Sequence, residues 1–207
     1  MYKRQPIAKA FLTDNGHIAT NACMQVFGGH GFIKEWGMEQ FVRDNRINMI
    51  YEGTNTIQSL DLLGRKILGN NGATLKKFGK LVGKLVEEEG TNEKMSEFIT
   101  PVAILGDQMT KFTTEIGFKG FQNPDEVGAA AVDYLRVAGH LVFGYFFARM
   151  AQVALREIAA GNTDPFYVAK LQTARFYFAK LFPETATLMR TARAGSKSLM
   201  DTEAALA

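Results

Sequence analysis

A chain of 207 residues, 46% of them hydrophobic, is long enough to bury a core and to form one large domain or two small ones. Its 24 basic and 21 acidic residues are spread along the sequence and give a formal charge of +3, without the basic block that a nucleic-acid partner favours. The longest uncharged apolar stretch, 137–148, has 12 residues and is too short to cross a bilayer. We therefore expect a soluble protein with no membrane span and no nucleic-acid partner.

The composition predicts an all-α protein. Prolines are few, five in all, and no long stretch alternates apolar and polar residues as a strand would. Cys23 is the only cysteine, which excludes an internal disulfide and a cysteine-based metal cluster, and no other metal-ligand spacing occurs. We expect a cytoplasmic protein without a metal site, in which Cys23 is a buried, inert thiol.

The first predicted helix runs from Pro6 to about Val26, with an Asp14-Asn15-Gly16 stretch in its middle. It is expected to end at Gly28-Gly29-His30-Gly31, where glycines permit positive φ and the close approach of another backbone or of a ligand. Two interpretations remain open: a helix C-cap and turn, with His30 as a turn residue, or a nucleotide contact.

The second predicted helix covers residues 35–50. Its charged residues include Glu39 and Arg43, which stand four apart in the order that favours an ion pair. Thr54 is expected to cap a third helix. That helix is expected to end at the glycine and asparagine cluster 69–72, which we predict to be a domain boundary, so that residues 1–72 form the first domain.

Glu52 lies between the second and third predicted helices, directly before a glycine and a threonine. Acidic residues near a helix start commonly serve only to complement the helix dipole. A carboxylate at a turn into a helix is also a candidate for catalysis, and position alone does not decide between the two roles.

Residues 73–207 are predicted to form a second domain, an antiparallel four-helix bundle. Apolar residues recur at spacings of three and four in segments 75–85 and 98–116, which predicts two helices. A loop is expected at 117–124, followed by a long helix over 125–160.

The last predicted helix begins at Asp164 and Pro165, a good cap followed by a good first residue. Its apolar spacing continues past Pro183, which is expected to bend this helix rather than stop it. His140, inside the longest apolar stretch, is expected to be a packed core residue.

Three motifs, taken together, resemble the C-terminal helical domain of the flavin-dependent acyl-CoA dehydrogenases. They are Gln25-Val26-Phe27-Gly28-Gly29-His30-Gly31, then Arg43-Asp44-Asn45-Arg46-Ile47, then Tyr51-Glu52-Gly53-Thr54 with Ile57-Gln58 and Gly64-Arg65-Lys66. Their order and spacing over roughly residues 5–70 are far more specific than any one motif. The bundle that follows is similar, less specifically, to the extra C-terminal domain of long-form bacterial members, which include 3-methylmercaptopropionyl-CoA dehydrogenases.

The resemblance implies an enzyme that oxidises an acyl-CoA thioester to the 2,3-enoyl-CoA with FAD. Glu52 would be the base that removes the α-proton while a hydride leaves the β-carbon for the flavin, and Gly53 would leave room for the substrate. Thr54, Asn55 and Thr56 match positions that contact FAD beside the base. The strip that matches the contact with the adenosine end of an FAD held mainly by a neighbouring subunit consists of Gln25, Val26, Phe27, Gly28 and Gly29.

The same resemblance implies a homo-oligomer, and an electron-transferring flavoprotein or similar acceptor as a partner. Arg43, Asp44 and Arg46 are expected to orient the site rather than to react. The family also has an N-terminal helical domain and a middle β-domain, so the resemblance implies a C-terminal fragment that alone binds FAD poorly and has no turnover. The alternative is a non-enzymatic helical interaction or oligomerisation module that retains the motifs as relics.

Overall fold

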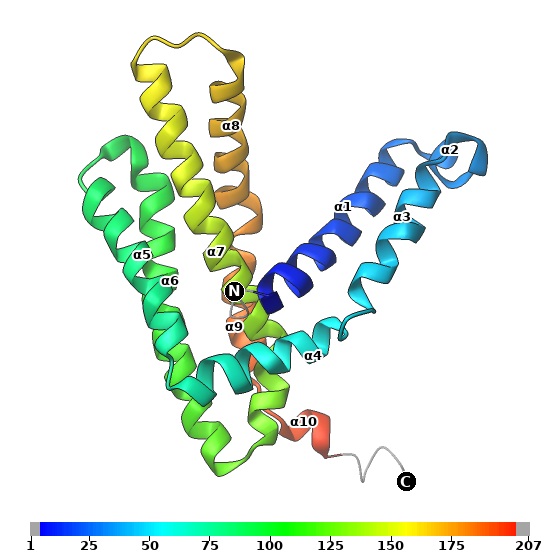
Figure 1. Ribbon diagram of the computed structural model, residues 1–207, viewed down its shortest axis with the longest axis vertical. Coiled ribbons are helices and arrows are strands. Elements are labelled where there is room, and N and C mark those ends of the chain that lie inside the picture. The colour runs from blue at the N-terminus through cyan, green and yellow to red at the C-terminus, as the bar shows by residue number, and fades with distance from the viewer. Residues whose placement is uncertain (1–4, 202–207) are drawn as a thin grey trace.

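The computed structural model describes residues 5–201, and within them every regular element is a helix (Figure 1). In chain order, with η for a 3-10 or π-helical stretch, the elements are η1 (Ile7–Phe11), α1 (Leu12–Val26), α2 (Gly29–Phe32), η2 (Lys34–Trp36), α3 (Met38–Arg46), η3 (Ile47–Met49), α4 (Asn55–Leu60), η4 (Asp61–Ile67), η5 (Leu68–Asn70), α5 (Ala73–Glu89), η6 (Glu93–Met95), α6 (Ser96–Gln122), α7 (Asp125–Ala159), α8 (Pro165–Phe176), η7 (Tyr177–Leu181), α9 (Glu184–Arg193) and α10 (Lys197–Met200). The all-α prediction is confirmed. None of the helices in the described part of the chain is long and apolar enough to cross a membrane.

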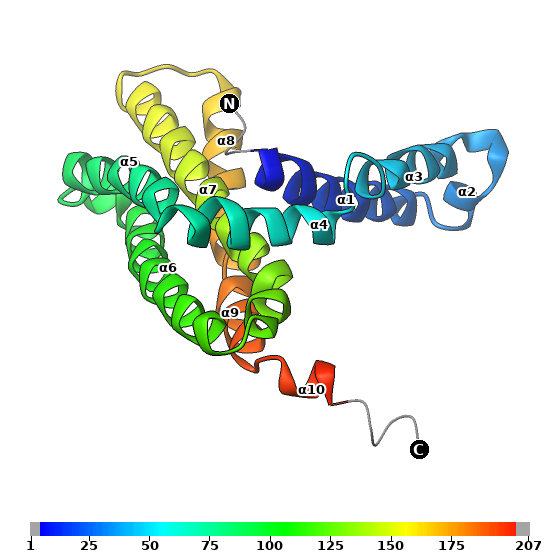
Figure 2. The ribbon, with the colours of Figure 1, turned by 60° about the horizontal axis from the view of Figure 1, so that its bottom comes forward.

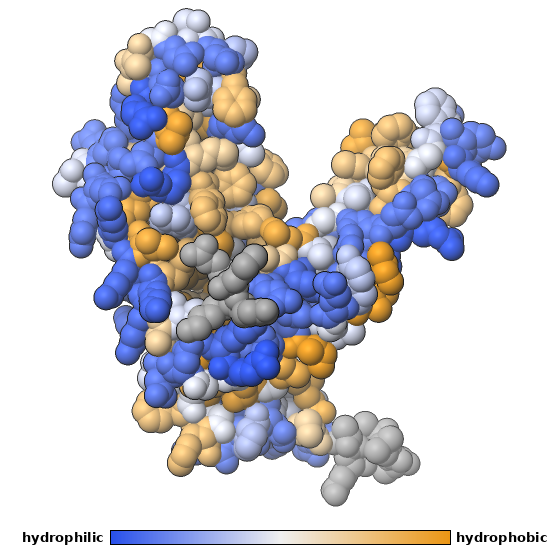
Figure 3. Space-filling model, viewed as in Figure 1, coloured by the Kyte–Doolittle hydropathy of each residue, from blue (hydrophilic) through white to orange (hydrophobic). Residues whose placement is uncertain are grey.

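Helices α1 and α3 pack against each other and form an arm that projects from the remaining helices (Figures 1 and 2). Large apolar side chains stay on the surface of this arm, among them Val26, Phe32 and Phe41, which are 87%, 77% and 65% exposed. Figure 3 shows apolar patches on the arm next to hydrophilic ones. The prediction of a buried Cys23 is wrong, because α1 lies on this arm and buries none of its residues.

The second predicted helix, 35–50, is interrupted. Gly37 has a φ of +69°, a left-handed conformation that ends η2 and lets α3 begin at Met38. The expected pair of Glu39 and Arg43 is not among the ion pairs of the described residues. Their helix is instead braced by a different (i, i+4) bond, in which Gln40 Nε2 donates to Asp44 Oδ1 at 2.6 Å.

Helix α4 and the stretches η4 and η5 follow one another without a break, and α4 and η4 pack across α7 (Figure 2). Asn71 and Gly72 end this segment with φ values of +53° and +72°, as the glycine and asparagine cluster predicts. Helices α5, α6 and α7 then follow as successive antiparallel neighbours, and α8 with α9 returns along α7 (Figure 1).

The expected loop at 117–124 is wrong, because α6 continues to Gln122. Two glycines in this stretch serve close packing instead of a turn. A Cβ added at Gly117 would lie 3.3 Å from Leu68 Cδ2, and one at Gly120 would lie 2.4 Å from Val127 Cγ2. The helices therefore approach each other where the sequence indicates flexibility.

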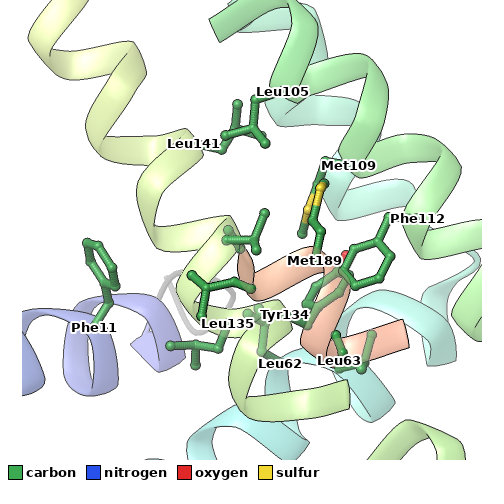
Figure 4. Packing of buried hydrophobic residues seen from close by; sticks show 14 of the residues in the cluster. Phe11, Leu62, Leu63, Leu105, Met109, Phe112, Tyr134, Leu135, Leu141 and Met189 are labelled. Carbon is green, nitrogen blue, oxygen red and sulfur yellow. The ribbon is translucent and has the colours of Figure 1, made fainter. Parts of the chain in front are cut away.

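A single hydrophobic cluster joins the first 72 residues to the rest of the chain. It takes Phe11, Leu62 and Leu63 from the first part and Tyr134 and Leu135 from α7, together with residues of α6 and α9 (Figure 4). A second cluster, farther along the bundle, gathers Leu85, Met95, Phe98, Ile99, Ala148, Ala151, Ala154, Leu171 and Ala174. Helix α7 contributes to both clusters and is the central helix of the fold.

The last long helix is bent at Pro183, as predicted. Before the proline the backbone widens into η7, and Phe182 N–H donates to Tyr177 O five residues back at 2.9 Å. The chain then continues as α9. His140 of α7 packs against this bend and is 3% exposed, which confirms its prediction as a core residue.

Candidate functional site

The turn between η3 and α4 holds Glu52 in an uncommon backbone conformation. Glu52 and Gly53 have φ values of +55° and +81°, so two successive residues are left-handed. This region costs a residue with a side chain about 1–2 kcal/mol, and such residues persist only where the surrounding structure fixes them. The Glu52 side chain is exposed, so its carboxylate is presented to the outside of the turn.

Thr54 occupies the N-cap position of α4, as predicted, with φ −53° and ψ 158°. Its side chain makes no capping hydrogen bond, so the first N–H groups of α4 donate none to it. Gln58, one turn into α4, bonds back to the turn: its side-chain amide donates to Glu52 O at 2.9 Å and its backbone N–H to Thr54 O at 3.0 Å.

The side chain of Asn55, the first residue of α4, points into the fold and ties this helix to the start of the arm. Asn55 Oδ1 accepts from Lys9 Nζ at 2.7 Å, and Asn55 Nδ2 donates to Asp14 Oδ1 at 2.5 Å and to Thr13 Oγ1 at 3.0 Å. Burial lowers the pKa of Lys9, while the charges of Asp14 and Glu52 act to raise it. The network fixes the start of α4 against η1 and α1.

A cavity of about 330 Å³ lies beside the start of α4, between η3 and α7. Thr54, Asn55 and Thr56 line one side of it, and the guanidinium-bearing residues Arg46 and Arg136 line another. Its volume is at the lower end of the range of small-molecule sites. The exposed side chain of Glu52 is not part of its lining.

The strip Gln25 to Gly29 lies at the tip of the arm, where α1 ends and α2 begins (Figure 1). All five residues are exposed, Gly28 has a φ of +59°, and a Cβ added at Gly28 or Gly29 would meet no atom within 4 Å. The backbone here is therefore open on its outer side. The close backbone approach is made next to the strip, where a Cβ at Gly31 would lie 2.3 Å from Met24 O.

The strip and the Glu52 turn are not brought together within one chain. Asp14 lies beside Asn55, and the helical rise from there to Val26 at the tip is about 18 Å. Figure 2 shows the tip and the start of α4 at separate places along the arm. His30, also at the tip, is exposed and packs edge-on against Trp36 with ring centroids 5.1 Å apart.

The charged residues of α3 stay apart from Glu52. Asp44 accepts a hydrogen bond from Gln40. Arg46 lines the cavity, and its Nη1 donates to Met49 Sδ at 3.2 Å. Arg43 is exposed. In residues 5–201, neither a hydrogen bond nor an ion pair links this helix to the Glu52 side chain.

Sequence reasoning missed two residues of the site and gave a third no role. Lys9 and Arg136 reach the site from distant parts of the chain, and no local pattern marks them. Gln58 belongs to the motif that contains Glu52, but the sequence did not indicate that its side chain bonds back to the Glu52 carbonyl.

Comparison with known proteins assigns both parts of the chain. A family model described as "Acetyl-CoA dehydrogenase C-terminal like" matches residues 75–203, more than half of the chain, and one described as "Acyl-CoA dehydrogenase, C-terminal domain" matches residues 3–68. The chain is 32% identical to a 3-methylmercaptopropionyl-CoA dehydrogenase of Ruegeria pomeroyi over 184 residues, which are 86% of this chain and 31% of that protein.

Two further relatives are covered to a similar extent. A butyryl-CoA dehydrogenase of Syntrophomonas wolfei is 28% identical over 95% of this chain and 33% of its own length. A broad-specificity linear acyl-CoA dehydrogenase of Mycobacterium tuberculosis is 27% identical over 86% of this chain and 31% of its own length. The chain thus spans about a third of the length of these curated relatives. On the evidence of the family models, the chain belongs to the acyl-CoA dehydrogenase family.

Proposed function

We propose that this chain carries the proton-abstracting base and two cofactor-contacting segments of an FAD-dependent acyl-CoA dehydrogenase. The observation that carries the proposal is the left-handed turn at Glu52 and Gly53, which presents an exposed carboxylate at the start of α4. Backbone strain of this kind is concentrated at functional sites. Family membership supplies the reaction class, oxidation of an acyl-CoA thioester to the 2,3-enoyl-CoA.

In the proposed mechanism, a Glu52 carboxylate oxygen takes the α-proton of the thioester. That proton is only weakly acidic, so charge that develops on the thioester carbonyl has to be stabilised, and the backbone N–H of Glu52 is the proposed donor. Gly53 is proposed to let the backbone of the turn come close to the substrate, while the place that a Cβ would take faces Gln58 and Ile57. Bound FAD would supply the acceptor for the hydride that leaves the β-carbon.

The residues of the chain fit FAD in two places. At the start of α4, Thr54 and Thr56 are exposed and the uncapped N–H groups are free to face a cofactor; the Asn55 side chain is engaged in its own network, which leaves its backbone for this contact. At the tip of the arm, the open backbone of the Gln25 to Gly29 strip suits the adenosine end. We propose that the two places serve the FAD molecules of different subunits in a homo-oligomer, as the family resemblance implies.

The proposed partners follow from this chemistry. The substrate is an acyl-CoA, and the electrons pass to an electron-transferring flavoprotein or a similar acceptor. The relatives' names include a short linear and a thioether acyl chain. A screen across short, branched, long and thioether acyl-CoA substrates measures which of them this site prefers.

Glu52→Gln in the full-length, flavin-loaded enzyme tests the base assignment. Because a positioned general base typically contributes about 100-fold or more, turnover is expected to fall by at least that factor while flavin absorbance is retained. Glu35→Gln, an exposed carboxylate on η2, is the matched control and is expected to leave turnover unchanged. Retained turnover in Glu52→Gln would remove this residue from the base role.

The 207-residue chain by itself is proposed to bind FAD poorly and to lack dehydrogenase activity, because it spans a third of its relatives. Purification with stoichiometric flavin absorbance, or reduction of an artificial electron acceptor by the chain alone, would overturn this part of the proposal.

A second candidate is a non-enzymatic interaction or oligomerisation module. The exposed apolar side chains of the arm favour it, since such patches commonly mark protein interfaces. Self-association in sedimentation experiments, together with an absence of flavin-dependent activity in every assembled form, would favour this candidate over the enzyme.

A further inference from the structure

Glu52 needs a specific support for its backbone. In the described part of the chain it shares a positive φ only with Asn71 among residues other than glycine. Asparagine adopts this conformation readily, because its short polar side chain can bond locally, whereas glutamate rarely does. The turn therefore holds Glu52 in its left-handed conformation by contacts from elsewhere.

One side-chain contact to the backbone of Glu52 comes from Gln58, whose amide Nε2 donates to Glu52 O at 2.9 Å. The backbone N–H of Gln58 makes the first i to i−4 bond of α4, to Thr54 O at 3.0 Å, which fixes Gln58 relative to the turn. Gln58 is only 8% exposed, which shields these bonds from competition by water.

The packing around Gly53 matches this arrangement. A Cβ added at Gly53 would lie 3.1 Å from Gln58 Nε2 and 3.6 Å from Ile57 Cγ2. The amide thus occupies the space that a side chain at Gly53 would need. The helix that carries Gln58 is itself fixed, because Asn55 is bonded to Lys9 and Asp14 at its start.

We propose that Gln58 is a positioning residue, whose side-chain amide holds the Glu52 carbonyl and so fixes the direction in which the Glu52 carboxylate points. The functional part of this inference rests on the proposed role of Glu52 as the base. Without the donor, the Glu52 carbonyl loses its partner, and the residue relaxes from the left-handed region toward conformations that aim its side chain elsewhere.

Limited proteolysis of the 207-residue chain with a glutamate-specific protease tests the clamp without any need for activity. Gln58→Met keeps a similar length and shape but removes the donor. The loss of one buried hydrogen bond is expected to raise the rate of cleavage after Glu52 about 10-fold, because proteolysis of a local opening follows its equilibrium population. Gln40→Met, which removes an amide bonded only to Asp44 on the exposed face of α3, is the control and is expected to leave that rate unchanged.

Cleavage after Glu115, far away on α6, serves as an internal reference for global unfolding. Gln58→Glu provides a second variant, since a carboxyl group of the same shape donates when protonated and cannot donate when ionised. The ratio of cleavage after Glu52 to cleavage after Glu115 is therefore expected to rise with pH in this variant and to stay constant in the wild type. An unchanged ratio in both Gln58 variants would overturn the clamp, whatever their overall stability.

Turnover of the flavin-loaded enzyme tests the functional part. A small misplacement of a reacting group costs about 10- to 100-fold, so Gln58→Met is expected to lower kcat by such a factor with KM for the acyl-CoA changed much less. An unchanged kcat would overturn the positioning role. If Glu52→Gln itself retains turnover, the base assignment fails, while the proteolysis ratio still reports on the clamp by itself.

Discussion

Glu52 and His140 show how single residues in this fold are controlled by their surroundings. His140 Nδ1 lies 3.0 Å from Tyr177 Oη and its Nε2 lies 3.3 Å from Glu184 Oε2, which also pairs through its carboxylate with Arg136. Burial lowers the pKa of His140 below its ordinary value of 6.5; the Glu184 carboxylate acts to raise it and Arg136 to lower it. The net result is a buried, neutral imidazole at the bend before α9.

This arrangement predicts a loss of stability in mild acid. A histidine whose pKa is lowered by folding binds its proton more readily in the unfolded state. The contribution of the neutral His140 to the free energy of unfolding is therefore complete above pH 6.5, and it is lost as the pH falls from 6.5 toward the lowered pKa of the folded state. The free energy of unfolding, measured by denaturant titration between pH 7.5 and about 5, is expected to decline in the wild type. His140→Gln is expected to flatten this decline, and an equal decline in the variant would contradict the assignment.

The neighbours of Glu52 show which part of the site the sequence can predict. The motif around Glu52 marked the turn and the start of α4, because glycine and threonine at these positions have local conformational consequences. Lys9 and Asp14 meet Asn55 across 46 and 41 residues of sequence. Such contacts follow from the packing of the arm against α4, and no local spacing encodes them.

At the scale of the helices, boundaries set by local chemistry were predicted well. Asp164 caps α8 as expected, and its Oδ1 accepts from Phe166 N–H at 2.9 Å. The extension of α6 through Gly117 and Gly120 was missed, because glycine serves both turns and close helix contacts, and the neighbours Leu68 and Val127 that decide between the two are far along the chain or in the next helix.

The cap of α8 carries a quantitative prediction. Asp164→Ala removes the bond to Phe166 N–H and is expected to lower the free energy of unfolding by about 1 kcal/mol. Asp164→Asn retains an acceptor oxygen and is expected to restore most of that loss. Thermal unfolding of the two variants and the wild type measures the difference, and equal stability of the alanine and asparagine variants would show that this side chain does not cap the helix.

At the scale of the molecule, the two parts of the chain are locked together where the arm begins. Phe11 lies against α7 at Gly139, where a Cβ would approach the Phe11 ring to 2.4 Å, and edge-on against His140 and Phe143. The shared core was not predictable from sequence, because helical periodicity reports which face of a helix is apolar but not which distant helix covers it. For the same reason, the sequence did not predict that the apolar side chains of the arm stay exposed.

Gly139→Ala tests this junction. The added methyl group has to displace the buried Phe11 ring, so the free energy of unfolding is expected to fall by about 1–3 kcal/mol. Gly128→Ala, in the same helix, meets no atom within 4 Å and is expected to stabilise the chain by roughly 0.5–1 kcal/mol. Denaturant unfolding measures both; a Gly139→Ala variant as stable as Gly128→Ala would contradict the close contact.

Removal of the α-proton of an acyl-CoA by the Glu52 carboxylate is tested most directly by exchange of that hydrogen with solvent. The flavin-loaded enzyme is incubated in D2O with an acyl-CoA and without an electron acceptor, and deuterium at the α-carbon is followed by mass spectrometry. Exchange is expected in the wild type and in Glu35→Gln, and at least about 100-fold slower exchange in Glu52→Gln with flavin still bound. Exchange at the wild-type rate in Glu52→Gln would contradict this role of Glu52.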